Sequence, residues 1–142
     1  MAKAPWFVDT GYLVAILNRR DRLHIEAKRL AELVERDGLT LLTTDGVVLE
    51  LANFFAASPL RGKAHEAVRR IRATPGFAVE GLSRTLLTRA EARYGAHPDK
   101  AWSLTDCASM ETMLDHGVTE ALTPDRHFAQ AGFRVLMSLH GA

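Results

Sequence analysis

Short apolar segments alternate with helical segments along the whole chain, and this alternation is the strongest constraint on the fold. Continuous apolar segments of this kind are typical of strands buried on both faces of a sheet. The predicted strands are Trp6–Val8, Leu39–Thr43, Phe77–Val79, Glu120–Thr123 and Phe133–Met137. Strands that alternate with helices pair in parallel, and right-handed crossovers place the helices on both faces. We therefore expect an α/β protein, a three-layer α/β/α sandwich with a mostly parallel sheet of about five strands.

The helical segments have apolar faces at helical spacing and end at recognisable stop signals. In Leu23–Arg36 the apolar residues fall near one face and the charged residues on the other, and Gly38 follows as a stop. A helix that starts at Asp45 runs to about Ala57, before Pro59. The remaining predicted helices are Tyr12–Leu17, Arg61–Arg72, Ser83–Arg93, Ser103–His116 and Arg126–Ala131.

The chain is expected to form a single domain over residues 1–142, because no linker or internal repeat divides it. Cys107 is the one cysteine, so an intrachain disulfide and a cysteine-based zinc site are both excluded. No apolar run approaches the roughly 18 residues of a membrane span, and the first residues lack the apolar core of a signal peptide. We therefore expect a soluble cytoplasmic protein with no membrane partner.

Charge is unevenly distributed, although the formal net charge is only +1. The segment from Arg61 to Lys100 has nine Lys or Arg and four Asp or Glu, whereas Ala101 to Asp125 has five acids and no Lys or Arg. This pattern suits an enzyme that holds cations in one place and a polyanion in another. For most of these arginines, however, a position on a solvated helix face is the favoured explanation.

Two acids lie at the ends of predicted strands, and two more lie on helices that can reach the same edge. Asp9 ends the first strand and Asp125 follows the fourth, so both belong at the carboxyl edge of the sheet, where ligands bind in such folds. Glu50 lies about one turn into the helix after the second strand, and Asp106 lies in the first turn of its helix. The topology therefore predicts four carboxylates in one pocket.

Three of these acids also have a structural explanation. Asp106 completes a variant of the capping box with Ser103, and Asp9 and Asp125 could cap or turn the chain before the helices that follow. Glu50 is harder to explain in this way, because its neighbours in sequence are apolar. Taken together, the four acids favour chemistry over capping.

Carboxylates crowded into one cleft repel each other and need a compensating positive charge. A hard divalent cation, Mg²⁺ or Mn²⁺, is the natural partner of an all-oxygen site. Two such ions could activate water and stabilise the leaving oxygen of a phosphodiester. The sequence leaves the number of ions, one or two, undecided.

Four motifs in this order resemble the PIN domain, and especially the VapC-like ribonuclease toxins of bacterial toxin–antitoxin pairs. The motifs are Phe7-Val8-Asp9-Thr10, the Glu50 segment from Thr44, the run from Asp99 to Cys107, and Thr123 to Phe128 followed by Ala131-Gly132-Phe133. The similarity extends from Trp6 to about Met137. The resemblance implies metal-dependent cleavage of single-stranded RNA by an acidic quartet, here Asp9, Glu50, Asp106 and Asp125, supported by Thr10.

The resemblance also implies a homodimer and an antitoxin protein as partners. An apolar cluster at Phe54, Phe55 and Leu60 points to the same dimer, because a small domain would leave part of it exposed. For RNA contacts we expect the basic segment Arg61–Arg93, with Arg69, Arg70 and Arg72 as the best candidates, since Arg suits phosphate.

Other functional classes fit the sequence less well. There is no glycine-rich phosphate loop, so a dehydrogenase or NTPase is not expected. His127 could line the pocket, but a surface position on a short helix is favoured; Cys107 is expected to be a buried hydrophobe, and Asp99 to cap or pair rather than bind metal. The main alternative to an enzyme is a non-catalytic RNA- or protein-binding module on a PIN-like scaffold.

Overall fold

The computed structural model describes residues 3–138. Its sheet has five parallel strands in the order β3-β2-β1-β4-β5, which confirms the predicted α/β architecture. The strands are β1 (Trp6–Val8), β2 (Leu41–Thr44), β3 (Phe77–Glu80), β4 (Glu120–Leu122) and β5 (Arg134–Val135). The helices are α1 (Thr10–Leu17), α2 (His24–Asp37), α3 (Asp45–Phe54), α4 (Arg61–Ala73), α5 (Arg84–Ala96), α6 (Leu104–Asp115) and α7 (Arg126–Gln130).

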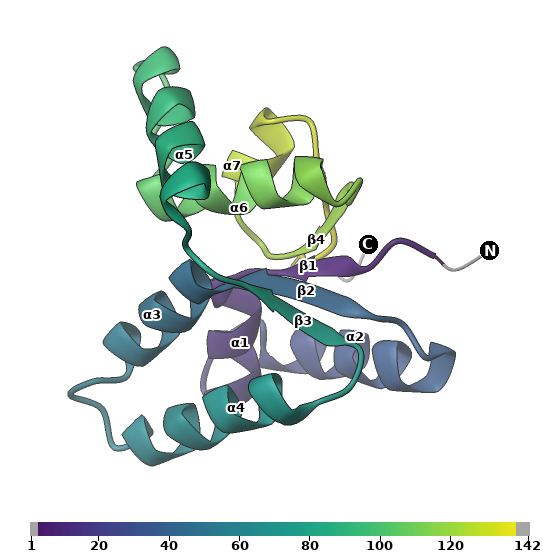
Figure 1. The fold of residues 1–142 in the computed structure, drawn as a ribbon. Coiled ribbons are helices and arrows are strands. Elements are labelled where there is room, and N and C mark those ends of the chain that lie inside the picture. The colour runs from purple at the N-terminus through teal and green to yellow at the C-terminus, as the bar shows by residue number, and fades with distance from the viewer. Residues whose placement is uncertain (1–2, 139–142) are drawn as a thin grey trace.

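The helices cover both faces of the sheet and make it the middle of three layers. Figure 1 shows α1 to α4 on one face and α5 to α7 on the other. The central strand β1 contributes Phe7 and Val8, both fully buried, to the core between these layers. The Thr43 hydroxyl donates to the Val8 carbonyl at 2.7 Å and so ties β2 to β1 inside the core. None of the helices within residues 3–138 has the length and apolar character needed to cross a membrane.

The order of the strands reverses at β1, and this reversal positions the site. From β1 the chain crosses to β2 and β3 on one side, whereas β4 and β5 lie on the other. At such a switch point the connections leave the carboxyl edge in opposite directions and open a crevice between them. The residues that follow β1 and β4 therefore meet at this crevice.

Three strands are shorter in the structure than the sequence predicts, β4 by the single residue Thr123. The sequence pattern starts the second strand at Leu39, but the Leu39 N–H donates to the Val34 carbonyl, and Gly38 ends α2 with a φ of 62°. Leu39 therefore belongs to the C-terminal cap of α2, and β2 begins at Leu41. β5 spans only Arg134–Val135, although hydrogen bonds from Leu136 to Ala121 and from Met137 to Thr123 extend its contact with β4.

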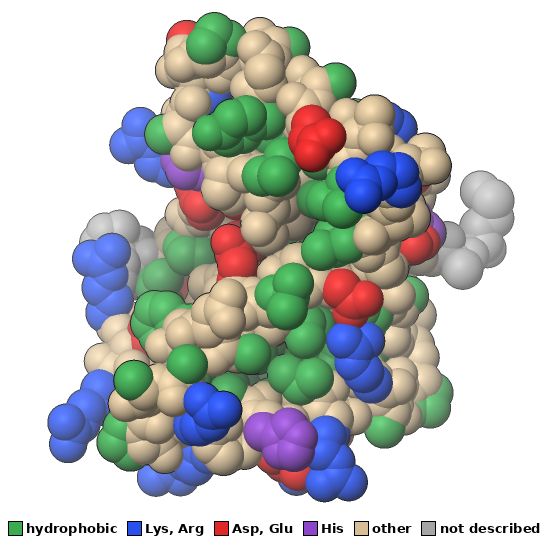
Figure 2. Space-filling view, turned by 60° about the vertical axis from the view of Figure 1, so that its left-hand side comes forward, with side chains coloured by type: hydrophobic (Ala, Val, Ile, Leu, Met, Phe, Trp, Pro, Cys, Tyr) green, Lys and Arg blue, Asp and Glu red, His purple; other side chains and the backbone are tan. Residues whose placement is uncertain are grey.

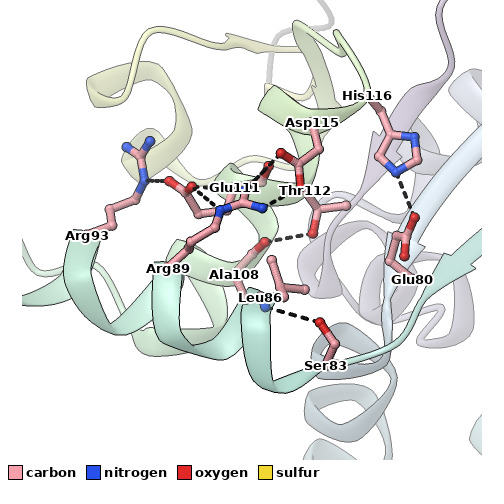
Figure 3. Close-up of polar contacts among 10 residues, drawn as sticks. All are labelled: Glu80, Ser83, Leu86, Arg89, Arg93, Ala108, Glu111, Thr112, Asp115 and His116. Carbon is pink, nitrogen blue, oxygen red and sulfur yellow. Dashed lines mark hydrogen bonds and ion pairs between the residues drawn. The ribbon is translucent and has the colours of Figure 1, made fainter.

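Helices α5 and α6 are clamped together by ion pairs, as Figure 3 shows. Arg89 binds both Glu111 (Nη2 to Oε1, 3.1 Å) and Asp115 (Nη2 to Oδ1, 2.8 Å), and Arg93 Nε donates to Glu111 Oε2 at 2.6 Å. Ser83 caps the start of α5 by accepting from the Leu86 N–H. The clamp holds α5 against the helix that carries Asp106.

The two sides of the crevice approach closely at Gly11, where an added Cβ would lie 2.9 Å from Pro124 Cδ. Gly to Ala in a helix normally stabilises by about 0.5–1 kcal/mol, whereas overpacking costs about 1–3 kcal/mol. We predict that Gly11→Ala lowers the free energy of unfolding by roughly 1 kcal/mol in urea denaturation.

Gly62 is the matched control, because it is also the second residue of a helix and nothing lies within 4 Å of a Cβ placed there. Gly62→Ala should stabilise the protein. Equal effects of the two substitutions would contradict the close approach of Gly11 to Pro124.

Candidate active site

Four carboxylates from distant parts of the chain line one pocket at the carboxyl edge of the sheet. Asp9 follows β1, Asp125 precedes α7, Glu50 comes from α3 and Asp106 from α6, around a cavity of about 520 Å³. Figure 2 brings this side forward and shows acidic side chains in the hollow between the upper and lower parts of the molecule. The four residues predicted from the sequence are thus brought together.

Asp9 is the most buried of the four, with 6% of its surface exposed. The Thr123 hydroxyl donates to Asp9 Oδ2 at 2.8 Å. Burial raises the pKa of Asp9 from 3.8 to about 7, and the nearby carboxylates of Asp106 and Glu50 contribute to the rise. Hydrogen bonds from Thr123 and from the backbone of Thr10 oppose this shift but do not cancel it. A carboxylate in this position is stabilised by any cation that enters the pocket.

Glu50 is half-buried and is held by Thr10. The Thr10 hydroxyl donates to Glu50 Oε1 at 2.6 Å, which links the first residue of α1 to α3. Burial raises the pKa of Glu50, the hydrogen bond from Thr10 lowers it, and the charges of Asp106 and Asp125 raise it. The apolar residues around Glu50 in sequence do not bury it, because α3 turns Glu50 toward the pocket and Leu49 toward solvent, where it is 55% exposed.

Asp106 both caps its helix and lines the pocket. Its N–H donates to Ser103 Oγ at 2.9 Å, and its Oδ2 accepts from the Ser103 N–H at 3.0 Å, which completes a capping box. Its side chain is nevertheless one of the pocket walls. The cap and the place in the pocket, which were alternatives in the sequence, are thus combined in one residue.

Asp125 has the same double position at the start of α7. Its Oδ1 accepts from the His127 N–H at 2.9 Å, and its own N–H donates to the Thr123 hydroxyl at 3.1 Å. Thr123 therefore connects Asp9 and Asp125 through one hydroxyl group.

His127 lies in the pocket, and the surface position favoured by the sequence is wrong. Its Nδ1 lies 3.1 Å from Asp106 Oδ2 and 3.3 Å from Asp125 Oδ1. The reason is the cap on α7: the bond from the His127 N–H to Asp125 starts the helix beside the acids and keeps the ring next to them. Asp99 pairs with Lys100 at 3.2 Å, as expected, and Cys107 is buried.

The donor set of the pocket fits a divalent cation. One ligand atom each from Asp106, Asp125 and His127 lies within 4.8 Å of the other two, and Asp9 and Glu50 line the same cavity. Carboxylate oxygens are the ligands preferred by Mg²⁺ and Mn²⁺, and an imidazole nitrogen is compatible with Mn²⁺. The cluster can therefore hold a metal ion.

Arg22 also lines the pocket, and no pattern in the sequence indicates it. It lies in the loop between α1 and α2, and no carboxylate among the described residues pairs with it. The loop is fixed by Asp21, whose Oδ1 accepts from the Leu23 N–H at 2.8 Å. The position of Arg22 depends on this loop conformation, which has no signature in the pattern of strands and helices.

The arginines proposed for RNA contacts lie outside the pocket, on α4. Arg69 and Arg70 pair with Glu66 at 3.7 and 3.5 Å, and Arg72 Nη2 binds Asp45 Oδ1 at 2.7 Å. Their role in RNA binding stays a prediction.

Comparison with known proteins agrees with this geometry. The PIN domain family matches residues 6–134, so the chain belongs to the PIN domain family. A crystal structure of VapC20 from Mycobacterium tuberculosis, a toxin that cleaves the sarcin–ricin loop, is similar to this fold with a TM-score of 0.80. The two chains are 25% identical over 93% of this chain and 98% of VapC20. No curated protein matched the sequence.

The pKa of Asp9 predicts a pH dependence of stability in the metal-free protein. Because folding raises this pKa from 3.8 to about 7, the Asp9 contribution to stability falls as pH rises between these values and stays constant above them. Asp9→Asn should therefore stabilise the protein more at about pH 8 than at about pH 4. Urea denaturation at both pH values measures the difference.

Asp99→Asn is the control, because Asp99 is an acid with a lowered pKa outside the pocket. Its removal should leave the Asp9-dependent fall in stability unchanged. A stabilisation by Asp9→Asn that did not vary with pH would contradict the raised pKa.

Proposed function

We propose that the protein is a metal-dependent endoribonuclease that hydrolyses phosphodiester bonds of single-stranded RNA, as the toxin of a toxin–antitoxin pair. The observation that carries this proposal is the convergence of Asp9, Glu50, Asp106 and Asp125 at the switch point of the sheet. Membership of the PIN domain family and the likeness to VapC20 support it. All four acids are present in one pocket, which argues against a non-catalytic binding module.

Asp9 and Asp106 are proposed as the principal ligands of Mg²⁺ or Mn²⁺, with Glu50 and Asp125 completing the acidic pocket. A bound ion would supply a water of lowered pKa and neutralise charge on the phosphate. Thr123 fixes the orientation of Asp9, and the capping box fixes that of Asp106. Glu50 Oε1 is occupied by the Thr10 hydroxyl, so Glu50 can accept a proton from the attacking water at Oε2.

Binding of the RNA phosphate needs a positively charged side chain that is not paired with one of the acids. Arg22 is the one arginine among the described residues lining the pocket. Its guanidinium has no partner among residues 3–138 and can bind phosphate. The RNA chain would contact three further arginines at a greater distance from the pocket, Arg69, Arg70 and Arg72.

Cleavage is tested with a labelled single-stranded RNA in Mg²⁺ or Mn²⁺, against an EDTA control. We expect metal-dependent cleavage that Asp9→Asn lowers by at least about a hundredfold. Replacing a residue that only orients a metal ligand already lowers metal affinity or activity about ten- to a hundredfold, and Asp9 is proposed as a ligand itself. Asp99→Asn, which removes an acid outside the pocket, should keep full activity. A folded Asp9→Asn protein with full metal-dependent activity would rule out the assignment.

RNA contacts are tested by the salt dependence of binding to the inactive Asp9→Asn protein. Arg22→Gln, and separately the triple replacement of Arg69, Arg70 and Arg72 by Gln, should weaken binding and reduce the salt slope by about 0.7 per lost phosphate contact. Arg20→Gln is the control for Arg22, because Arg20 lies in the same loop but lines a different hollow. An unchanged slope removes the tested residues from the RNA path.

We propose a second copy of this chain, in a homodimer, and an antitoxin as the protein partners. We also propose a cytoplasmic location, because it fits an RNA substrate. The predicted apolar cluster is only partly exposed: Phe54 is 61% exposed, but Phe55 is 2% exposed and Leu60 packs against the core. The exposed apolar surface on α3 is instead Phe54 together with Leu49. Phe54 is therefore the part of the predicted cluster that is left exposed, whereas Phe55 and Leu60 belong to the core.

Light scattering tests the dimer directly. We expect a dimer at tens of micromolar, and Phe54→Ser should shift it toward monomer because the substitution removes exposed apolar surface. A monomer of the unmodified protein at that concentration would count against the dimer.

A further inference from the structure

A groove adjoins the acidic pocket and is not explained by the acids. It has a volume of about 1010 Å³ and lies between the end of α5 and the segment that precedes α6. Ala101 and Ser103 line both the groove and the acidic pocket, so the two hollows are neighbours that share part of one wall. The larger side chains that line the groove are Glu91, Tyr94, His97, Lys100, Trp102 and Leu104.

Two of the exposed large hydrophobic side chains of the described residues line the groove. Tyr94 is 55% exposed and Leu104 is 38% exposed, and both are among the few large hydrophobic side chains left exposed in the described part of the chain. Trp102 also lines the groove, 6% exposed, with its ring centroid 4.8 Å from that of His97. The Trp102 Nε1–H donates to Gln130 at 3.1 Å, which fixes the indole ring. An exposed aromatic ring beside a fixed apolar base is a stacking surface.

Both walls of the groove are held rigidly relative to the catalytic acids. Tyr94 follows Arg93, whose ion pair with Glu111 holds this part of α5 against α6 (Figure 3). On the other wall, the Lys100 N–H donates to the His97 carbonyl at 3.0 Å, and Ser103 caps α6. A surface ordered in advance loses little entropy when a ligand binds.

The chemistry of the groove matches a nucleotide rather than a fully apolar ligand. The Lys100 ammonium lies at the groove and, among the described residues, pairs only with the exposed Asp99, so it can also contact a phosphate. Aromatic rings next to a cation bind unpaired bases by stacking while the cation contacts the backbone. Because the groove and the acidic pocket share Ala101 and Ser103, a strand with a phosphate at the acids can place a neighbouring base in the groove.

We propose that this groove binds one unpaired nucleobase of the RNA substrate beside the scissile phosphate, by stacking on Tyr94. The proposal rests on the proposed ribonuclease function and adds a base-binding subsite to it. The enzyme therefore requires a single-stranded nucleotide at this position, and paired RNA cannot fill it.

The test measures the affinity of the inactive Asp9→Asn protein for a short, unstructured, fluorescently labelled RNA, with abasic nucleotides introduced one position at a time. Tyr94→Leu, which keeps apolar bulk but removes the ring, should weaken binding about tenfold, the usual value of one base stack. Tyr94→Phe should bind like the parent. Leu114→Ala is the control, because Leu114 on α6 is equally exposed, at 56%, and lies outside the groove.

At one position, an abasic nucleotide should weaken binding to the parent about tenfold and remove the difference in affinity between the parent and the Tyr94→Leu protein. If Tyr94→Leu has no effect, or weakens binding to every abasic RNA by the same factor, the subsite is overturned. If Tyr94→Leu changes the oligomeric state in light scattering and leaves RNA affinity unchanged, the groove is a protein interface and the proposal is wrong.

The two proposals fail separately. Wild-type protein that never cleaves RNA contradicts the ribonuclease, whatever Tyr94 does. Cleavage by the wild type without coupling between Tyr94 and a base contradicts the subsite alone.

Discussion

The structure depends on the burial of one carboxylate, Asp9, at the point where the sheet reverses its strand order. Asp9 follows the central strand and is 6% exposed, and two further carboxylates raise its pKa in addition to the effect of burial. A buried like-charged cluster is costly in a folded protein unless protons or a cation offset the charge. The cost is concentrated where a divalent ion would bind, which is why the cluster is better explained by chemistry than by stability.

Hydroxyl groups hold the acids in place without neutralising them. Thr10 binds Glu50, Thr123 binds Asp9, and Ser103 caps the helix of Asp106. The hydroxyls of Thr10 and Thr123 and the N–H of Ser103 each bond to one carboxylate oxygen and bring no positive charge, so a cation can still supply it. The surrounding elements are fixed in turn, since the ion pairs of Arg89 and Arg93 hold α5 on α6. The site is therefore ordered by contacts that a metal ion does not need to supply.

The fold and the acids could be predicted from the sequence because both follow from chain order. The alternation of strands and helices fixes a parallel sheet, and parallel strands bring Asp9 and Asp125 to one edge. The capping roles of Asp106 and Asp125 were also visible, but as alternatives to a site, whereas the structure combines both roles. Arg22 and His127 could not be placed, because their positions depend on a loop conformation and on one helix cap. The end of α2 at Gly38 agrees with the predicted stop, but the second strand starts two residues later than predicted, since Leu39 looks like a strand residue and instead completes the cap at Gly38.

The central claim is that the acidic pocket is a divalent-cation site whose apo form retains protons. Titration calorimetry of Mn²⁺ into the protein near pH 7, in two buffers of different ionisation enthalpy, tests it most directly, because the pKa of Asp9 is raised to about 7. The account predicts saturable binding whose apparent enthalpy differs between the buffers, which reports proton release, and loss of this binding in Asp106→Asn. Absence of binding, or binding that Asp106→Asn leaves intact, would contradict the account.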